Sequence, residues 1–199
     1  MDEINVDEMH ADEMHVDETA RQYTYADYEK IDDDNRYEII DGVIYLMSAP
    51  SIPHQRISYK LSHQLYTFLQ GKPCEMLTAP VDVCLNAAGD SDRTVVQPDI
   101  IVVCDRSKLD FKRCNGAPDM VVEILSPSTA SRDMTIKHEK YMQAGVREYW
   151  VVDPDSKSVH VFVLKDGEYE ATDYPEGGVV PVRVLDGCEI DLNLVFADA

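Results

Sequence analysis

Residues 118–129 read PDMVVEILSPST, and the prediction of the fold starts from this stretch. The run 120–125 is almost entirely apolar and rich in β-branched side chains, which predicts a strand buried on both faces. Pro127 and the hydroxyl residues around it end the strand and offer caps for a following helix. Glu123 interrupts the apolar run, at a position where a carboxylate is costly unless it has a partner.

The segments on either side of this strand predict a mixed α/β chain. β-Branched runs indicate strands, Asp-Gly pairs indicate tight hairpin turns, and apolar residues at helical spacing indicate helices. Further strands are predicted at 81–85, 95–104, 148–152 and 182–185, hairpins at 37–46 and 159–172, and helices at 25–31, 53–71 and 126–144. This order predicts an α/β sandwich with a central mixed sheet flanked by helices and additional N- and C-terminal hairpins.

Length and composition favour one soluble domain. The 199 residues are 44% hydrophobic and 28% charged, which is typical of a single globular unit. No apolar run approaches the ~20 residues of a membrane helix, and the N-terminus lacks the pattern of a signal peptide, so we expect a cytoplasmic protein with no membrane contact. None of the five cysteines forms a C-x-x-C pair, and we expect them to be reduced.

The net charge of −20 is unevenly distributed. Residues 2–18 repeat Asp-Glu every five positions, a pattern that fits neither helix nor strand, so we expect a disordered acidic tail at 1–21 and one domain at 22–199. The tail holds eight acids, which leaves 30 acidic against 18 basic residues, a net charge of −12. A nucleic-acid function therefore needs a divalent metal or a local basic patch. Candidates for the patch are Arg56, Lys60, Arg132, Lys137, Lys140 and Arg147.

Two acids from different strands form the candidate metal site. Asp119 and Glu123 share a strand face, but four residues place them about 13 Å apart, too far for one cation. Asp99, in the apolar run 95–103, could approach Glu123 if the two strands are neighbours. Mg²⁺ or Mn²⁺ would suit two carboxylates and water. The alternative is that Asp99 only ends a turn after Pro98 and that Glu123 pairs with an arginine.

A second candidate group lies on the predicted helix after Glu123. Asp133, Lys137 and Tyr141 are each four residues apart and share one helical stripe. A solvated Asp-Lys pair explains the spacing of the first two equally well.

Taken together, these motifs resemble the putative restriction endonuclease family of the PD-(D/E)-x-K nuclease superfamily. The resemblance covers about residues 22–195. It rests on QPD at 97–99, PDMVVEILSPST at 118–129, Asp133 with Lys137 and Tyr141, GVREYWVVDP at 145–154, YEIIDG at 37–42, and MSAPS at 47–51 with His54.

The resemblance implies a restriction-endonuclease-like fold and a Mg²⁺-dependent site, in which Mn²⁺ would substitute. Asp99 and Glu123 would be the metal ligands and catalytic acids. Leu125 stands where the superfamily has its lysine, and Lys137 matches the lysine that this family recruits from the next helix. Glu38 matches an additional catalytic carboxylate. His54 stays open between a site residue and a helix-start residue, and Tyr141 stays open between a site residue and core packing.

The activity implied is endonucleolytic hydrolysis of phosphodiester bonds, with DNA as substrate. A homodimer is expected because a two-fold axis would match the two strands of a duplex. The competing interpretation is a catalytically silent module on the same fold, which binds nucleic acid or protein and whose acidic tail contacts a basic partner.

We predict that removal of residues 1–19 leaves the domain folded, because a tail of this composition has little to bury. Urea unfolding followed by tryptophan fluorescence should give the same midpoint and slope for the truncated and the full chain. A lower midpoint or a non-cooperative transition in the truncated protein would show that the repeat is part of the fold.

Overall fold

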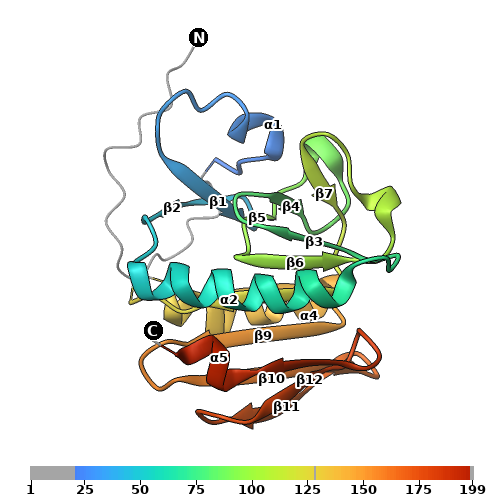
Figure 1. Cartoon of the computed structure of the whole chain (residues 1–199). Helices are drawn as coiled ribbons and strands as arrows, with labels where there is room; N and C mark the ends of the chain where they lie inside the picture. Colours follow the sequence, from blue (N-terminus) through green and yellow to red (C-terminus); the bar gives the residue numbers. More distant parts are fainter. Residues whose placement is uncertain (1–20, 128, 198–199) are drawn as a thin grey trace.

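The computed structural model describes residues 21–127 and 129–197 and contains two main β-sheets (Figure 1). A six-stranded sheet has the order β11-β10-β9-β8-β6-β3, and a five-stranded sheet has the order β2-β1-β5-β4-β7. The six strands are β3 (Glu75–Thr78), β6 (Ile100–Val103), β8 (Met120–Ile124), β9 (Glu148–Asp153), β10 (Ser158–Lys165) and β11 (Glu168–Tyr174). The five are β1 (Arg36–Ile40), β2 (Val43–Met47), β4 (Asp82–Cys84), β5 (Val95–Val96) and β7 (Arg113–Asn115). The predicted tail at 1–21 lies outside the described residues, apart from Arg21.

The helices lie around both sheets. They are α1 (Tyr25–Tyr28), α2 (Ile52–Leu69), α3 (Ala130–Arg132), α4 (His138–Ala144) and α5 (Leu192–Phe196), with a π-helical turn, η3 (Asp133–Lys137), between α3 and α4. In Figure 1, α2 crosses in front of the six-stranded sheet and α4 lies behind it, so α2 and α4 cover opposite faces of that sheet. Within the described residues, none of the helices combines the length and the hydropathy that crossing a membrane requires.

The six-stranded sheet is mixed, as predicted. β8 and β9 run parallel, with Met120 opposite Glu148, whereas β8 and β6 run antiparallel. A parallel pair needs a crossover connection, and the segment from α3 to α4 supplies it. The predicted α/β architecture, with a mixed sheet flanked by helices, is therefore confirmed.

Side chains of β8 alternate between two apolar layers. Met120, Val122 and Ile124 pack in the layer that contains α2, and Val121 packs in the layer that contains Tyr141 of α4. The whole strand is buried. Glu123 shares the parity of Val121, so its carboxylate enters the layer between the sheet and α4.

The predicted strand at 95–104 is wrong, because the chain changes sheets within it. Val95–Val96 forms β5 in the five-stranded sheet, and Ile100–Val103 forms β6 in the six-stranded sheet. Pro98 has no N–H to donate to a strand ladder, so it stands between the two strands. Asp99 consequently lies where the chain passes from one sheet to the other.

The hairpins at 36–47 and 158–174 are confirmed, whereas the end of the chain differs from the prediction. At both turns an aspartate and a glycine have positive φ, for example 52° at Asp41 and 81° at Gly42, which fits a tight hairpin. The predicted strand at 182–185 is wrong. The C-terminal hairpin instead pairs β12 (Val179–Val182) with β13 (Cys188–Asp191). Strands β3 and β7 are not predicted from the sequence, because they are short and carry polar residues.

The expectation of five reduced cysteines is corrected, because Cys74 and Cys104 form a disulfide. The pairing of Glu75 with Val103 between β3 and β6 brings the two cysteines side by side. Cys84, Cys114 and Cys188 are free and buried. The bridge depends on the pairing of β3 with β6, and the number of cysteines does not reveal that pairing.

We predict that unreduced protein, denatured and alkylated with iodoacetamide, carries three labels, because three of the five cysteines are free. Prior reduction should raise the number to five. Intact mass spectrometry measures both states, and five labels without reductant would contradict the bridge.

Candidate active site

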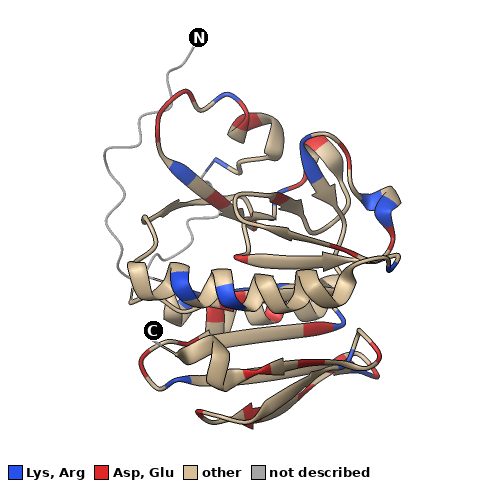
Figure 2. Ribbon diagram, viewed as in Figure 1, with Lys and Arg blue, Asp and Glu red and all other residues tan. Residues whose placement is uncertain are grey.

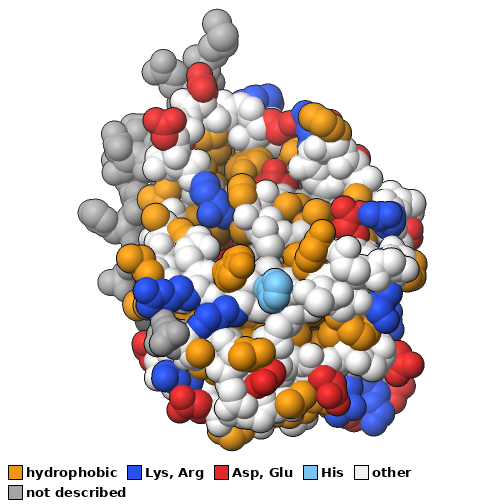
Figure 3. Space-filling model, viewed as in Figure 1, with side chains coloured by type: hydrophobic (Ala, Val, Ile, Leu, Met, Phe, Trp, Pro, Cys, Tyr) orange, Lys and Arg blue, Asp and Glu red, His pale blue; other side chains and the backbone are white. Residues whose placement is uncertain are grey.

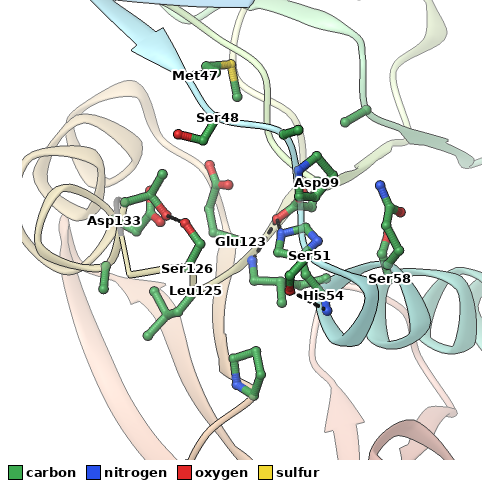
Figure 4. Close-up of a pocket in the computed structure, with 18 of the residues that line it drawn as sticks. Met47, Ser48, Ser51, His54, Ser58, Asp99, Glu123, Leu125, Ser126 and Asp133 are labelled. Carbon is green, nitrogen blue, oxygen red and sulfur yellow. Dashed lines mark hydrogen bonds and ion pairs between the residues drawn. The ribbon is translucent and has the colours of Figure 1, made fainter.

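A pocket of about 880 Å³ opens where the two sheets meet the first turn of α2 (Figure 4). Its wall comes from segments that are distant in the sequence. It includes residues 47–51 after β2, 53–55 of α2, 78–80 after β3, 123–127 at the end of β8, and 153–155 after β9. Asp99, Asp133 and Lys137 also line it. The two predicted metal ligands, Asp99 and Glu123, therefore face one cavity.

Asp99 reaches the pocket from the link between β5 and β6. Its Oδ2 accepts a 2.8 Å hydrogen bond from the backbone N–H of Ile124, the residue after Glu123. The pairing of Ile100 with Val122 continues to this position, so Asp99 lies in line with Glu123 on the neighbouring strand. The predicted approach of the two acids thus follows from the register.

His54 also contacts Asp99. Ser51 caps α2 by accepting a hydrogen bond from the His54 N–H, which fixes the first turn. His54 Nε2 lies 3.2 Å from Asp99 Oδ2, and the imidazole is buried in the pocket wall. Figure 4 shows this pair beside Glu123. His54 is therefore part of the site and does more than start the helix.

Glu123 is buried, and two side chains of the following helical segment hold its carboxylate. Its Oε1 accepts hydrogen bonds from Tyr141 Oη at 2.6 Å and from Lys137 Nζ at 2.9 Å. The alternative that an arginine neutralises Glu123 is wrong, because the partner is Lys137. Tyr141 is fully buried, so it contributes both to the core and to the orientation of this carboxylate.

Lys137 lies at the centre of a cluster of three buried carboxylates. Its Nζ is 2.7 Å from Glu38 Oε1, 2.9 Å from Glu123 Oε1 and 3.4 Å from Asp133 Oδ1. Only 2% of the surface of Lys137, and 2% of that of Asp133, is exposed. The alternative of a solvated Asp-Lys pair is therefore overturned.

Burial and charge act against each other in this cluster. Burial raises the pKa of Glu123 well above its usual value, and Lys137 opposes that rise. The pKa of Asp133 is raised for the same main reason and opposed by the same lysine. Burial alone would lower the pKa of Lys137, but the carboxylates of Glu123, Glu38 and Asp133 raise it well above its usual value. Lys137 is thus held in its charged form.

The π-helical turn η3 places Asp133 and Lys137 in the cluster. The prediction of one regular helix at 126–144 is wrong in this detail, because η3 separates α3 from α4. π-Helical turns are rare and are frequent at functional sites. Asp133 and Lys137 face inward with Tyr141, whereas Met134 and Ile136 of the same turn are partly exposed. In this turn, therefore, the charged side chains are buried and the apolar side chains are partly exposed to solvent.

The donors at the pocket fit Mg²⁺. Mg²⁺ is commonly held by one or two carboxylates, with water and substrate phosphate as the other ligands. Asp99 and Glu123 line the same cavity and provide such carboxylates. Among residues 21–127 and 129–197, no group of three or more His, Cys, Asp or Glu side chains forms a complete metal cage. This donor set suits a hydrated cation that is completed by substrate.

The structure brings all four predicted site residues together, in two layers. Asp99, Glu123 and Lys137 line the pocket, and Glu38 lies behind Lys137. Glu38 is fixed there by the backbone N–H of Gln97, which donates to its Oε1 at 2.9 Å. Asp133 is not predicted from the sequence to be buried beside the site. Its place on the same stripe as Tyr141, a residue of core character, was the available signal.

We predict that Lys137→Met destabilises the metal-free protein by about 3–5 kcal/mol at pH 8, the range for breaking a buried ion pair. Without the lysine, the raised pKa values of Glu123 and Asp133 rise further. The native state then holds protons that the unfolded chain releases above about pH 4.3, so stability falls as pH rises. Urea unfolding in EDTA should show a much smaller loss at pH 5.

Lys140→Met is the matched control, because Lys140 pairs with Asp41 at the surface. Its effect on the free energy of unfolding should be within about 1 kcal/mol at both pH values. A pH-independent loss in Lys137→Met, equal to that of the control, would contradict the buried charge cluster.

Comparisons with known proteins agree with this fold and with the family resemblance. A family described as "Putative restriction endonuclease" (Uma2) matches residues 23–193. The protein slr1290 of Synechocystis, named as uncharacterized, is 29% identical over 145 residues, which are 69% of this chain and 74% of that protein. A crystal structure of a putative DUF820 nuclease from Anabaena variabilis has a TM-score of 0.71 and 21% identity, and the match covers 87% of this chain and 97% of that chain. That likeness confirms the expected restriction-endonuclease-like fold. Because the family match spans almost the whole described chain, the protein belongs to the "Putative restriction endonuclease" family.

Proposed function

We propose that this protein is a metal-dependent endonuclease that hydrolyses phosphodiester bonds in DNA. The observation that carries the proposal is the convergence of Asp99 and Glu123, from neighbouring strands, on one pocket with Lys137 beside them. Carboxylates that hold a cation, together with a lysine, suit the hydrolysis of a phosphate ester. Membership of the family supports the same class of reaction.

Asp99 and Glu123 would hold Mg²⁺ or Mn²⁺. When bound, the cation would lower the pKa of a coordinated water and neutralise charge on the phosphate. The backbone N–H of Ile124 and the imidazole of His54 fix the Asp99 carboxylate. Tyr141 and Lys137 fix the Glu123 carboxylate. These contacts orient both acids before substrate arrives.

Lys137 would act on the reacting phosphate as a buried cation. Its ammonium lines the pocket and would stabilise the negative charge that develops as water attacks phosphorus and the ester oxygen leaves. Glu38 and Asp133 are positioning residues in this proposal. They keep Lys137 charged and hold its Nζ toward Glu123.

A catalytically silent binding module is the second candidate. The net charge of −12 outside the tail favours it, because such a chain repels phosphate backbones over most of its surface. The two candidates differ in whether the pocket carries out chemistry when a divalent cation is added.

We predict that Mg²⁺ and Mn²⁺ raise the melting temperature and support nicking of supercoiled plasmid DNA. A ligand that binds only the native state stabilises it by mass action. Asp99→Asn should lose most of the thermal shift and at least about 100-fold in nicking rate, because a metal ligand is removed. Differential scanning fluorimetry and gel densitometry measure the two effects.

Asp119→Asn is the matched control. Asp119 precedes β8 but binds Arg147 and the N–H of Cys104 away from the pocket. It should keep both the thermal shift and the nicking. A metal-induced shift without DNA cleavage by the wild type would favour the silent module, and equal losses in both variants would place the cation elsewhere.

A further inference from the structure

One segment of this acidic chain contains no acid. Residues 42–74 carry no Asp or Glu, whereas the whole chain has 38, and the segment includes Arg56 and Lys60. Most of this segment is α2 (Ile52–Leu69). The helix therefore presents an uninterrupted non-acidic surface on a protein that is otherwise strongly negative.

The two faces of α2 differ completely. Ile57, Leu61 and Leu65 pack in the core beneath the helix. The rest of its surface carries basic and aromatic residues, which we call the α2 stripe: the exposed Arg56, Tyr59, His63 and Tyr66, and Lys60, which is half-buried. At 1.5 Å per residue the stripe extends about 15 Å along the helix.

The aromatic rings of the stripe face the solvent. Tyr59 is 72% exposed and Tyr66 is 58% exposed. The ring of Tyr59 stacks with that of His63 at a centroid distance of 6.3 Å. In Figure 3, hydrophobic, basic and histidine side chains gather over α2, and acidic side chains lie outside this band. Because these two tyrosine rings are largely exposed, they contribute little to the packing of the core beneath α2.

Four of the six candidate basic residues are engaged with carboxylates outside α2. Lys137 is buried in the site cluster, Lys140 pairs with Asp41, and Arg147 pairs with Asp119. Arg132 lies 3.8 Å from Glu38. Two of the six predicted basic residues, Arg56 and Lys60, lie on α2, and Figure 2 shows basic residues along this helix.

Lys60 itself points to an anionic ligand. Its Nζ is buried, and within the described part of the chain it has no hydrogen-bond partner. A buried ammonium without a partner is costly, so an anion supplied from outside would stabilise it.

The stripe is continuous with the pocket. Pro53, His54, Gln55 and Ser58 of the same helix line the pocket wall. Arg56 and Tyr59 follow these residues directly on the outward side of α2. A chain molecule bound in the pocket would therefore leave it along this helix.

We propose that the α2 stripe binds a single-stranded segment of nucleic acid and leads it into the pocket. This inference rests on the proposed nuclease function and adds its substrate class, a single strand or a single-stranded end. Exposed aromatic rings bind bases by stacking, and lysine and arginine bind the phosphates. The bases of a duplex are stacked inside it, so Tyr59 and Tyr66 can stack only on unpaired bases.

A second copy of the chain is a poorer occupant. A two-fold interface brings each patch onto itself, so Arg56 and Lys60 would meet identical cations without any acid from residues 42–74. Like charges in contact oppose association. A polyphosphate strand supplies the opposite charge.

Binding of labelled oligonucleotides, measured by fluorescence anisotropy in EDTA with the full chain, tests the inference. EDTA prevents cleavage and separates binding from chemistry. The probes are oligothymidine and oligouridine of about 15 nucleotides, within the range of known single-strand sites, and a mixed-sequence DNA duplex. We expect both single strands to bind more tightly than the duplex, and a comparison of the two distinguishes DNA from RNA as the strand.

The variants resolve the contribution of each group. Tyr59→Ala and Tyr66→Ala should each weaken single-strand binding about tenfold, within the range for loss of base stacking, whereas Tyr59→Phe should retain it. Lys60→Gln should reduce the salt dependence, log Kd against log salt, by about 0.7 for the loss of one phosphate contact. Phe111→Ala removes an exposed aromatic ring in the loop before β7 and should leave binding unchanged.

Several results would overturn the inference. Unchanged strand binding in both tyrosine variants would do so even if plasmid nicking is intact, and so would a clear preference for the duplex. A dimer in solution that Tyr59→Ala dissociates, with no strand binding, would assign the stripe to self-association. Conversely, strand binding that depends on the stripe in a protein without any cleavage would uphold this surface and refute only the nuclease proposal.

Discussion

The buried ammonium of Lys137 is the interaction on which the site depends. It contacts carboxylates from β1, β8 and η3, and each of these elements would carry an uncompensated charge into the interior without it. The lysine thereby fixes the distance between the five-stranded sheet, which provides Glu38, and the six-stranded sheet, which provides Glu123. The Lys137 ammonium therefore contributes both to the stability of the fold and to the charge of the pocket.

The second constraint is the change of sheets at Pro98. Because proline cannot donate to a ladder, β5 and β6 separate there, and Asp99 emerges between the two sheets. Its carboxylate then accepts from the N–H of Ile124, one residue beyond Glu123. Asp99 and Glu123 lie close together because the link between β5 and β6 is in register with Glu123 of β8.

Charged side chains are unevenly distributed along the chain. Over most of the chain, basic side chains are paired with acids, for example Lys140 with Asp41. The helix α2 contrasts with the acidic remainder of the chain, since its core face is apolar and its exposed side is aromatic and basic. Its first turn also supplies His54 to Asp99. One helix therefore connects the core, the candidate metal ligands and the proposed path of the substrate.

The class of fold, the strand that carries Glu123 and both Asp-Gly hairpins can be predicted from the sequence, because they depend on local periodicity and turn chemistry. The four candidate site residues come from motifs in the same way. Tertiary structure alone decided the disulfide between Cys74 and Cys104, the burial of Asp133 and the division of residues 95–104 between two sheets. Each of these depends on which strands become neighbours. Pairing across a sheet joins residues that are distant in the chain, and local sequence patterns do not predict which strands will pair.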